Sequence, residues 1–141
     1  MVHHRLSEEK LNFDKKEERL KLSVKFFLNE AGSEPVRDWL KSLPKEDSRR
    51  ILVDIKTVQL GWPLGMPLMD SIGSGIWEVR TKLLNSISRI LFIAEEGQLI
   101  LLHGLIKKTP KTSKQDIDIA KDRIKILIKL KKYESNCKKE V

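Results

Sequence analysis

Cysteine and long apolar runs are both scarce in this sequence, and each absence excludes a class of protein. The one cysteine, Cys137, cannot form a disulfide within the chain, which favours a reducing compartment. It also lacks the neighbouring His or Asp that would activate a nucleophile, so we expect an inert thiol. No run approaches the roughly 18 apolar residues of a membrane-spanning helix, and the charged N-terminus has no apolar signal-peptide core. The sequence therefore predicts a cytoplasmic protein without a membrane span.

Histidine is also rare, and its placement does not predict a metal site. His3 and His4 are adjacent in a charged N-terminal segment with no third ligand in view, and His103 stands alone in an apolar stretch. Structural zinc sites use several closely spaced ligands. We therefore predict neither a metal nor a cofactor.

Positive charge is what the sequence has in excess. Lysine and arginine number 28 against 20 acidic residues, which gives a net charge of +8 and a pI near 9.6. This balance favours an anionic partner, with nucleic acid first and an acidic protein or a membrane surface next. At 141 residues the chain should form one domain with its own core.

The stretch Gly75–Lys108 carries the clearest structural pattern. Asn85-Ser86 and Glu95-Glu96-Gly97-Gln98 are turn signals that separate three short apolar segments. The first segment alternates, and the other two are near-continuous apolar runs that need cover on both faces. The pattern predicts a three-strand antiparallel meander with strands at 76–80, 88–94 and 99–106.

One further strand and two helices are expected before the meander. The alternation from Leu20 to Asn29 predicts the strand. Ser33 can N-cap a helix that ends near Leu43. Pro44 then opens an amphipathic helix that ends near Gly61. A loop is expected from 61 to 74.

A last helix is expected after the meander. Ser113 followed by Asp116 is typical of a capped helix start. An apolar stripe that should pack on the sheet comprises Ile117, Ala120, Ile124, Leu127 and Ile128. The opposite face, expected to be solvated, carries Lys121, Arg123, Lys125, Lys129, Lys131 and Lys132. The domain should then span 20–134, with a charged extension at 1–19 and a frayed tail at 135–141.

Four cations should meet at one edge of the meander. Arg80 lies near the end of the first strand and Arg89 near the start of the second, and an antiparallel turn brings such positions together. Lys107 and Lys108 end the third strand, which runs parallel to the first. A cluster of this kind suits a phosphodiester backbone, although any one member alone could equally be a solvated strand-end residue.

Four short motifs in this order resemble those of the RelE/ParE toxin superfamily. They are Trp-Glu-Val-Arg at 77–80, Arg-Ile-Leu-Phe at 89–92, Leu-Leu-His-Gly-Leu-Ile-Lys-Lys-Thr at 101–109 and Lys-Thr at 111–112. The resemblance extends from about Leu20 to Lys132 and is closest to the HigB-like branch, which is related to phage-derived host-inhibition proteins. It implies an α+β fold, in which an antiparallel sheet of one N-terminal strand and the meander packs with two N-terminal helices and a C-terminal helix.

The resemblance also implies a function. It indicates the toxin of a type II toxin–antitoxin system, a metal-independent endoribonuclease that cuts mRNA on the ribosome and inhibits translation. The implied partners are mRNA, the ribosome and a cognate antitoxin of the helix-turn-helix type, with no membrane partner. In this chemistry the RNA 2′-OH attacks the adjacent phosphate, and clustered cations stabilise the phosphorane.

The motif positions imply which residues carry this chemistry. The implied catalytic residues are Arg80, Arg89, Lys107 and Lys108, and the implied substrate-binding residues are His103, Lys111 and Lys82. Glu78 shares a strand face with Arg80 and is predicted to be a structural partner of a cation.

Three features depart from the family pattern. The stretch 61–75 contains no cation where the family often has one. Ser113 stands where a proline usually follows Lys-Thr, and the only tyrosine, Tyr133, lies at the end of the last helix. Two other functions therefore stay open: a ParE-like toxin that inhibits DNA gyrase without cutting RNA, and a non-catalytic RNA-binding protein.

Overall fold

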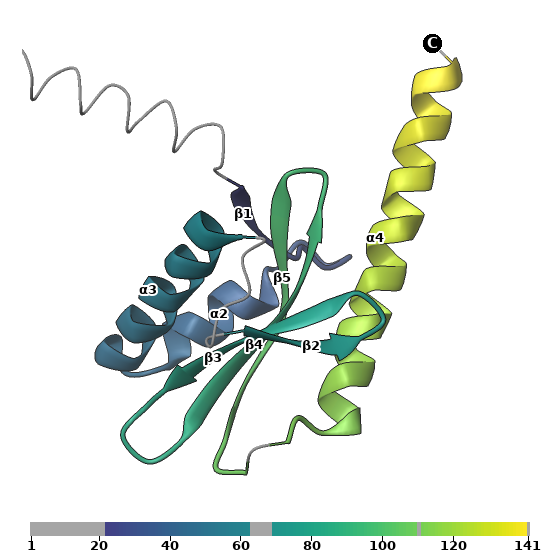
Figure 1. Cartoon of the computed structure of the whole chain (residues 1–141). Coiled ribbons are helices and arrows are strands. Elements are labelled where there is room, and N and C mark those ends of the chain that lie inside the picture. The colour runs from purple at the N-terminus through teal and green to yellow at the C-terminus, as the bar shows by residue number, and fades with distance from the viewer. Residues whose placement is uncertain (1–21, 63–68, 110, 141) are drawn as a thin grey trace, which may run out of the picture.

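A five-stranded sheet with helices on both faces organises the chain (Figure 1). The computed structural model describes residues 22–62, 69–109 and 111–140. The strand order is β1-β5-β4-β3-β2, and α2 and α3 pack on one face while α4 packs on the other. The predicted α+β class is confirmed. The elements are β1 Ser23–Phe26, α2 Pro35–Ser42, α3 Lys45–Gly61, β2 Met69–Gly73, β3 Ile76–Lys82, β4 Ile87–Glu95, β5 Gln98–Lys107 and α4 Lys114–Glu140.

The predicted meander is confirmed as β3, β4 and β5, each antiparallel to the next. Glu96 and Gly97 both have positive φ in the turn between β4 and β5, a conformation that glycine adopts without steric cost. Arg80 and Arg89 are direct cross-strand neighbours, as the antiparallel turn required.

Two features of the sheet differ from the prediction. β1 pairs with β5 in parallel, so the sheet is mixed rather than wholly antiparallel. β2 is an edge strand that pairs with β3, in part of the stretch predicted as the loop 61–74. Gly73, Ser74 and Gly75 all have positive φ, which permits the tight reversal between these two strands. The rest of that predicted loop at 63–68, and the extension at 1–19, lie outside the described residues.

The helices α2 and α3 build an apolar core against one face of the sheet. Pro35 occupies the first turn of α2, where its missing N–H costs nothing. Ser33 is not the N-cap as predicted, because Glu34 holds that position and the backbone N–H of Ser33 donates to Asn29 Oδ1 at 2.8 Å. The buried residues of this core are Val36, Leu40, Ile51, Ile55, Val58, Val79, Ile90, Phe92, Leu99 and Leu101.

The helix α4 packs its apolar stripe on the opposite face. Ala120, Ile124 and Leu127 join the core there, as predicted. Ile128 was assigned to the same stripe but is 50% exposed. The stripe centres on Ala120 and Leu127, and Ile128 lies about 100° farther around the helix than Leu127.

Arg123 also differs from its predicted place on the solvated face of α4. Its Nη1 donates a hydrogen bond to the Leu102 carbonyl, and its guanidinium lies 5.7 Å from the centre of the Phe27 ring. Burial lowers the pKa of Arg123. Beyond it, α4 continues to Glu140 rather than ending near residue 134, because the sequence after Ser113 contains neither glycine nor proline.

A β-bulge at Leu102 determines the face that His103 occupies. Leu91 pairs with His103 and Phe92 pairs with Leu101, so Leu102 is an extra residue in β5. In a regular strand, His103 would follow Leu101 onto the α2–α3 face. The bulge turns it instead toward α4, and Arg123 caps the carbonyl of the bulged residue.

The same bulge places Gly104 beneath α2. A Cβ atom at this position would lie 2.4 Å from the ring of Trp39, closer than any real contact. Packing therefore explains the glycine of the Leu-His-Gly motif, because the indole of Trp39 lies directly on the backbone of β5, where a side chain has no room.

Candidate functional site

A buried carboxylate lies on the α4 face of the sheet. Glu78, on β3, is 1% exposed. Its Oε1 accepts a hydrogen bond from Arg80 Nε at 2.7 Å, and its Oε2 accepts one from the Thr112 hydroxyl at 2.6 Å. Arg89 Nη1 lies 3.9 Å from the same Oε1. A buried charge requires partners of this kind, and the predicted pairing of Glu78 with a cation is confirmed.

Arg89 lies beneath the segment that joins β5 to α4. It is 1% exposed, its Nη1 donates to Thr112 Oγ1 at 2.7 Å, and its Nη2 donates to the Thr109 carbonyl at 3.1 Å. Thr112 thus bridges Arg89 and Glu78 and fastens this segment to the sheet. Arg89 is placed to support its neighbours and is inaccessible to a substrate in this conformation.

Arg80 is the exposed member of this network, with 40% of its side chain accessible. Its Nε is held by Glu78, which fixes the direction of the guanidinium. Among the described residues, β2 pairs with β3 from Gly73–Ile76 to Met69–Val79, and Arg80 follows the last of these pairs. An oriented guanidinium at the surface suits two-pronged contact with phosphate oxygens.

Arg80 lines two surface hollows. The first, which we call the rim pocket, has a volume of about 330 Å³ and is lined by Ile72, Glu78, Arg80, Arg89, Lys111, Thr112 and Ile117. The second, the edge groove, has a volume of about 780 Å³ and is lined by Arg49, Arg50, Val53, Asp54, Arg80, Thr81, Lys82 and Ile87. Cations outnumber acids in both hollows, which favours an anionic occupant.

A second polar cluster lies where α4 begins. Asp116 Oδ1 accepts a hydrogen bond from His103 Nε2 at 2.8 Å, and Lys107 Nζ lies 2.8 Å from Oδ2. The Ser113 hydroxyl donates to Oδ2 and accepts the backbone N–H of Asp116, so the predicted capping of this helix is confirmed.

The protonation of this cluster follows from the pKa of Asp116. Partial burial raises this pKa, but hydrogen bonds with Lys107, Ser113 and His103, together with the charge of Lys107, more than offset that effect and lower it to about 2. The carboxylate is therefore ionised at neutral pH and only accepts hydrogen bonds. It follows that His103 Nε2 carries a hydrogen.

The described residues contain neither a metal-binding cluster nor a membrane-spanning helix. No group of three or more His, Cys, Asp or Glu side chains in that part of the chain is arranged to hold a metal ion. Among the helices of residues 22–62, 69–109 and 111–140, none has both the length and the apolarity to cross a bilayer.

Comparison with known families gives the site its context. The family described as "Phage derived protein Gp49-like (DUF891)" matches residues 38–125, which is more than half of the chain. The chain belongs to the Gp49-like family. This is a family of RelE/HigB-type toxins, commonly the toxins of toxin–antitoxin systems, and it is associated with toxin endoribonuclease activity. No curated protein matches the chain.

All the site residues predicted from the sequence lie inside the Gp49-like match, and the structure divides them into groups. Four of them line the rim pocket or the edge groove, namely Arg80, Arg89, Lys82 and Lys111. Lys107 and His103 contact Asp116 and line neither hollow. Lys108 is exposed just beyond the end of β5 and also lines neither.

Several residues that the fold adds to this region were not predicted from the sequence. Arg49 and Arg50 of α3 line the edge groove beside Arg80. The sequence pattern that could have indicated them is an Arg-Arg pair just outside the apolar stripe of an amphipathic helix. Thr112 was visible only as part of a motif, and nothing local in the sequence shows that it bridges Arg89 and Glu78.

Proposed function

We propose that this Gp49-like protein is a HigB-like toxin of a type II toxin–antitoxin system, and that it cuts mRNA on the ribosome and so inhibits translation. The observation that carries the proposal is the state of Arg80. Its guanidinium is oriented by a buried carboxylate, reaches solvent, and lies between two hollows in which cations predominate. This combination suits a phosphate that gains negative charge during a reaction.

RNA supplies the nucleophile in the proposed reaction. The 2′-OH loses its proton to solvent water and its oxygen attacks the adjacent phosphorus, which forms a pentacoordinate phosphorane. The bond from phosphorus to the 5′-oxygen then breaks, that oxygen takes up a proton, and a 2′,3′-cyclic phosphate is left. Charge develops on the non-bridging oxygens, and Arg80 can donate two parallel hydrogen bonds to them in the transition state.

The other cations receive distinct roles in this proposal. Lys111 shares the rim pocket with Arg80 and adds charge near the scissile phosphate. The phosphates on either side of that bond would contact the edge groove, where Lys82 lies. Arg89 is a positioning residue, because it is buried and bonded to Thr112.

The cations at the end of β5 are proposed to act at the margin of the site. Lys108 would attract the RNA backbone as an exposed charge. Lys107 and His103 are both held by Asp116, and we assign them to the substrate path beside the rim pocket rather than to proton transfer. With these roles, we propose that the protein acts in the cytoplasm on mRNA and the ribosome.

The family context also supports an antitoxin partner, which we propose to be a helix-turn-helix protein. The net charge of +8 favours an acidic partner and an association that weakens as salt is added. Equal binding of the two purified proteins at low and high salt would show that charge is not the main contribution.

Primer extension on mRNA in a purified translation mixture tests the proposed activity. We expect new 5′ ends within translated message when the protein is present, and none when initiation is blocked so that the message carries no elongating ribosomes. Intact message together with arrested DNA supercoiling by gyrase would support the ParE-like function instead. Intact message with RNA binding alone would support a non-catalytic RNA-binding protein.

A further inference from the structure

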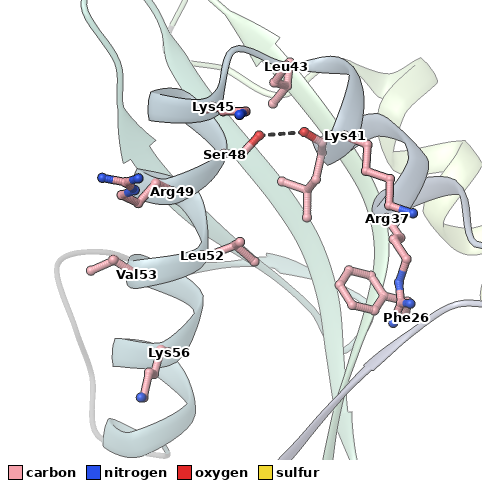
Figure 2. Close-up of a pocket in the computed structure, with 11 residues that line it drawn as sticks. Phe26, Arg37, Lys41, Leu43, Lys45, Ser48, Arg49, Leu52, Val53 and Lys56 are labelled. Atoms are coloured by element: carbon pink, nitrogen blue, oxygen red, sulfur yellow. Dashed lines mark hydrogen bonds between the residues drawn. The ribbon is translucent and has the colours of Figure 1, made fainter.

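The edge groove combines several cations with a single acid. Of the described residues that line it, Arg49, Arg50, Arg80 and Lys82 are cationic, and Asp54 is the one acid. Figure 2 shows Arg49 and Val53 on the side of α3 that points away from Leu52, and both residues also line the edge groove. Asp54 lies about 60° around the helix from the buried Ile51 and is half-buried, so it belongs to the inner wall of the groove. The groove therefore offers one acceptor among several donors.

The carboxylate of Asp54 is not used by the fold. Arg50 precedes it by four residues, a spacing that allows an ion pair on a helix, but Arg50 Nη2 instead lies 3.0 Å from Glu46 Oε1. Arg80 Nε donates to Glu78. No hydrogen bond or ion pair joins the Asp54 carboxylate to another residue within 22–62, 69–109 and 111–140. Because a carboxylate only accepts hydrogen bonds, Asp54 is available to a donor group on a ligand.

The RNA backbone offers what both kinds of side chain in this groove require. Each nucleotide has a phosphate, which attracts cations, and a 2′-OH, which can donate a hydrogen bond to a carboxylate. DNA has the phosphate but lacks the hydroxyl. An acid in the groove would repel a DNA phosphate and receive no hydrogen bond in return. The single acid among the cations therefore distinguishes the two nucleic acids.

We propose that the edge groove selects RNA over DNA, and that Asp54 makes this selection by accepting a hydrogen bond from a ribose 2′-OH. The cations of the groove hold the phosphates on either side of that ribose. The inference rests on the proposed function, which brings RNA to this groove, but it requires no cleavage. It makes Asp54 a specificity-determining residue for binding and gives it no part in proton transfer.

Two other ligands fit the edge groove less well. A divalent metal ion takes several oxygen ligands, whereas this groove provides one carboxylate surrounded by positive charge. An acidic peptide would pair with the cations, but its carboxylates would face Asp54 and cannot donate a hydrogen bond to it.

Fluorescence anisotropy with three labelled oligonucleotides tests the proposal on the full-length protein without ribosomes. Each is an oligo-uridine of about 12 nucleotides, long enough for one single-strand binding site, and they differ only in the 2′ substituent. The first carries the hydroxyl, the second a fluorine and the third a hydrogen. The fluorine preserves the sugar conformation of RNA but has no hydrogen to donate, so it separates the hydrogen bond from the shape of the strand. A gel confirms that each oligonucleotide is intact after the measurement.

We expect wild type to bind the RNA about tenfold more tightly than the 2′-fluoro strand or the DNA. Asp54→Ala should bring the ratio of the RNA and 2′-fluoro affinities close to one, and it should bind the 2′-fluoro strand more tightly than wild type does, because the repulsion is lost. Asp54→Asn should keep part of the preference, since its amide oxygen still accepts a hydrogen bond.

Two further variants separate this role from a general effect of charge. Lys82→Ala should weaken the binding of the RNA and of the 2′-fluoro strand by the same factor, because both contain the phosphate. Asp47→Ala is the matched control, since Asp47 is also a half-buried acid on α3 but lines neither the edge groove nor the rim pocket. It should keep the wild-type ratio. Urea midpoints of all variants show that each one is folded.

Four results would overturn the proposal. Wild type could fail to bind the RNA, or could bind the RNA and the 2′-fluoro strand equally. Asp54→Ala could keep the wild-type ratio, or Asp47→Ala could lose it to the same extent. The nuclease proposal fails separately, in the cleavage assay with ribosomes. A protein that prefers RNA through Asp54 but leaves message intact would keep this inference alone, and one that cuts message without this preference would lose it alone.

Discussion

The two faces of the sheet use charged residues in opposite ways. On the α4 face, Glu78 and Arg89 are each 1% exposed and are joined through Thr112. On the α2–α3 face the core is apolar, and the cations of the two helices are exposed, among them Arg37, Lys41, Lys45, Arg49 and Lys56. A buried charge lowers the stability of the fold unless its hydrogen-bonding and ionic partners are all present. An exposed cation stays hydrated and changes the stability little. The α4 face therefore fixes the direction of a few charged side chains, whereas the α2–α3 face keeps its charged side chains in solvent.

This contrast gives Arg80 its special position. It is bonded to the buried network through Glu78, yet its side chain is 40% exposed and lines both the rim pocket and the edge groove. A rigid support and access to solvent are both needed by a group that must meet a substrate at a fixed geometry.

The largest expected effect on stability is that of Glu78→Ala. It removes the carboxylate that three side chains contact and leaves the buried charge of Arg89 poorly compensated. We expect the free energy of unfolding to fall by about 3–5 kcal/mol, measured by urea denaturation. Glu46→Ala is the control, because Glu46 forms an exposed pair with Arg50 and its loss should cost less than about 1 kcal/mol. Similar losses in the free energy of unfolding for both variants would show that the buried charges of the α4 face stabilise the fold no more than an exposed ion pair does.

The next largest effect is that of Gly104→Ala on the α2–α3 face. The added methyl group would lie 2.4 Å from the Trp39 ring, so the indole or β5 must move. We expect a loss of about 1–3 kcal/mol in the free energy of unfolding, as for other overpacked sites. In a Trp39→Leu background the same change should cost much less. An equal cost in both backgrounds would assign it to the backbone rather than to this contact.

Gly104 also shows what the sequence could and could not predict. The meander and the Arg80–Arg89 neighbourhood followed from strand spacing and turn residues, which are local, and the α+β class was implied by the resemblance to the RelE/ParE toxins. The reason for Gly104 depends on Trp39, which lies far away in the chain, and on a bulge at Leu102 that no local signal marks. The strand β2 was missed because its evidence is the reversal at 73–75 rather than an apolar alternation.

The residues of the candidate site were likewise predictable from the sequence only in part. Strand ends and turns predicted a cluster of Arg80, Arg89, Lys107 and Lys108, and of these four only Arg80 and Arg89 line the rim pocket. They did not predict that Arg89 is buried, since an arginine on an apolar strand gives no sign of whether its partners will cover it. Arg49 and Arg50 depend on how α3 packs beside β3, which is decided by the tertiary fold.

A smaller effect concerns acid stability at the start of α4. The pKa of Asp116 is lowered from 3.8 to about 2 in the folded protein, so its contribution is fully present above about pH 4 and is lost as the pH falls toward 2. The contribution should be at most about 2 kcal/mol. Asp116→Asn should flatten this part of the curve of unfolding free energy against pH. Asp118→Asn is the control, because Asp118 is exposed on the same helix, and its curve should follow that of wild type. If the unfolding free energy of Asp116→Asn fell with decreasing pH as steeply as that of wild type, Asp116 would not be the source of this acid sensitivity.

The smallest expected effect on stability belongs to Arg80, and this makes Arg80 the most direct test of the account. Because 40% of its side chain is exposed and Glu78 keeps Thr112 and Arg89 beside it, Arg80→Ala should lower the free energy of unfolding by only about 1 kcal/mol. The rate of mRNA cleavage on the ribosome should nevertheless fall about a hundredfold, and Arg80→Lys should restore only part of it, since an ammonium cannot replace a planar two-pronged donor. The decisive measurement is the single-turnover cleavage rate of wild type, Arg80→Ala and Arg80→Lys, paired with the urea midpoint of each. A folded Arg80→Ala protein that cuts message at the wild-type rate would contradict the central claim.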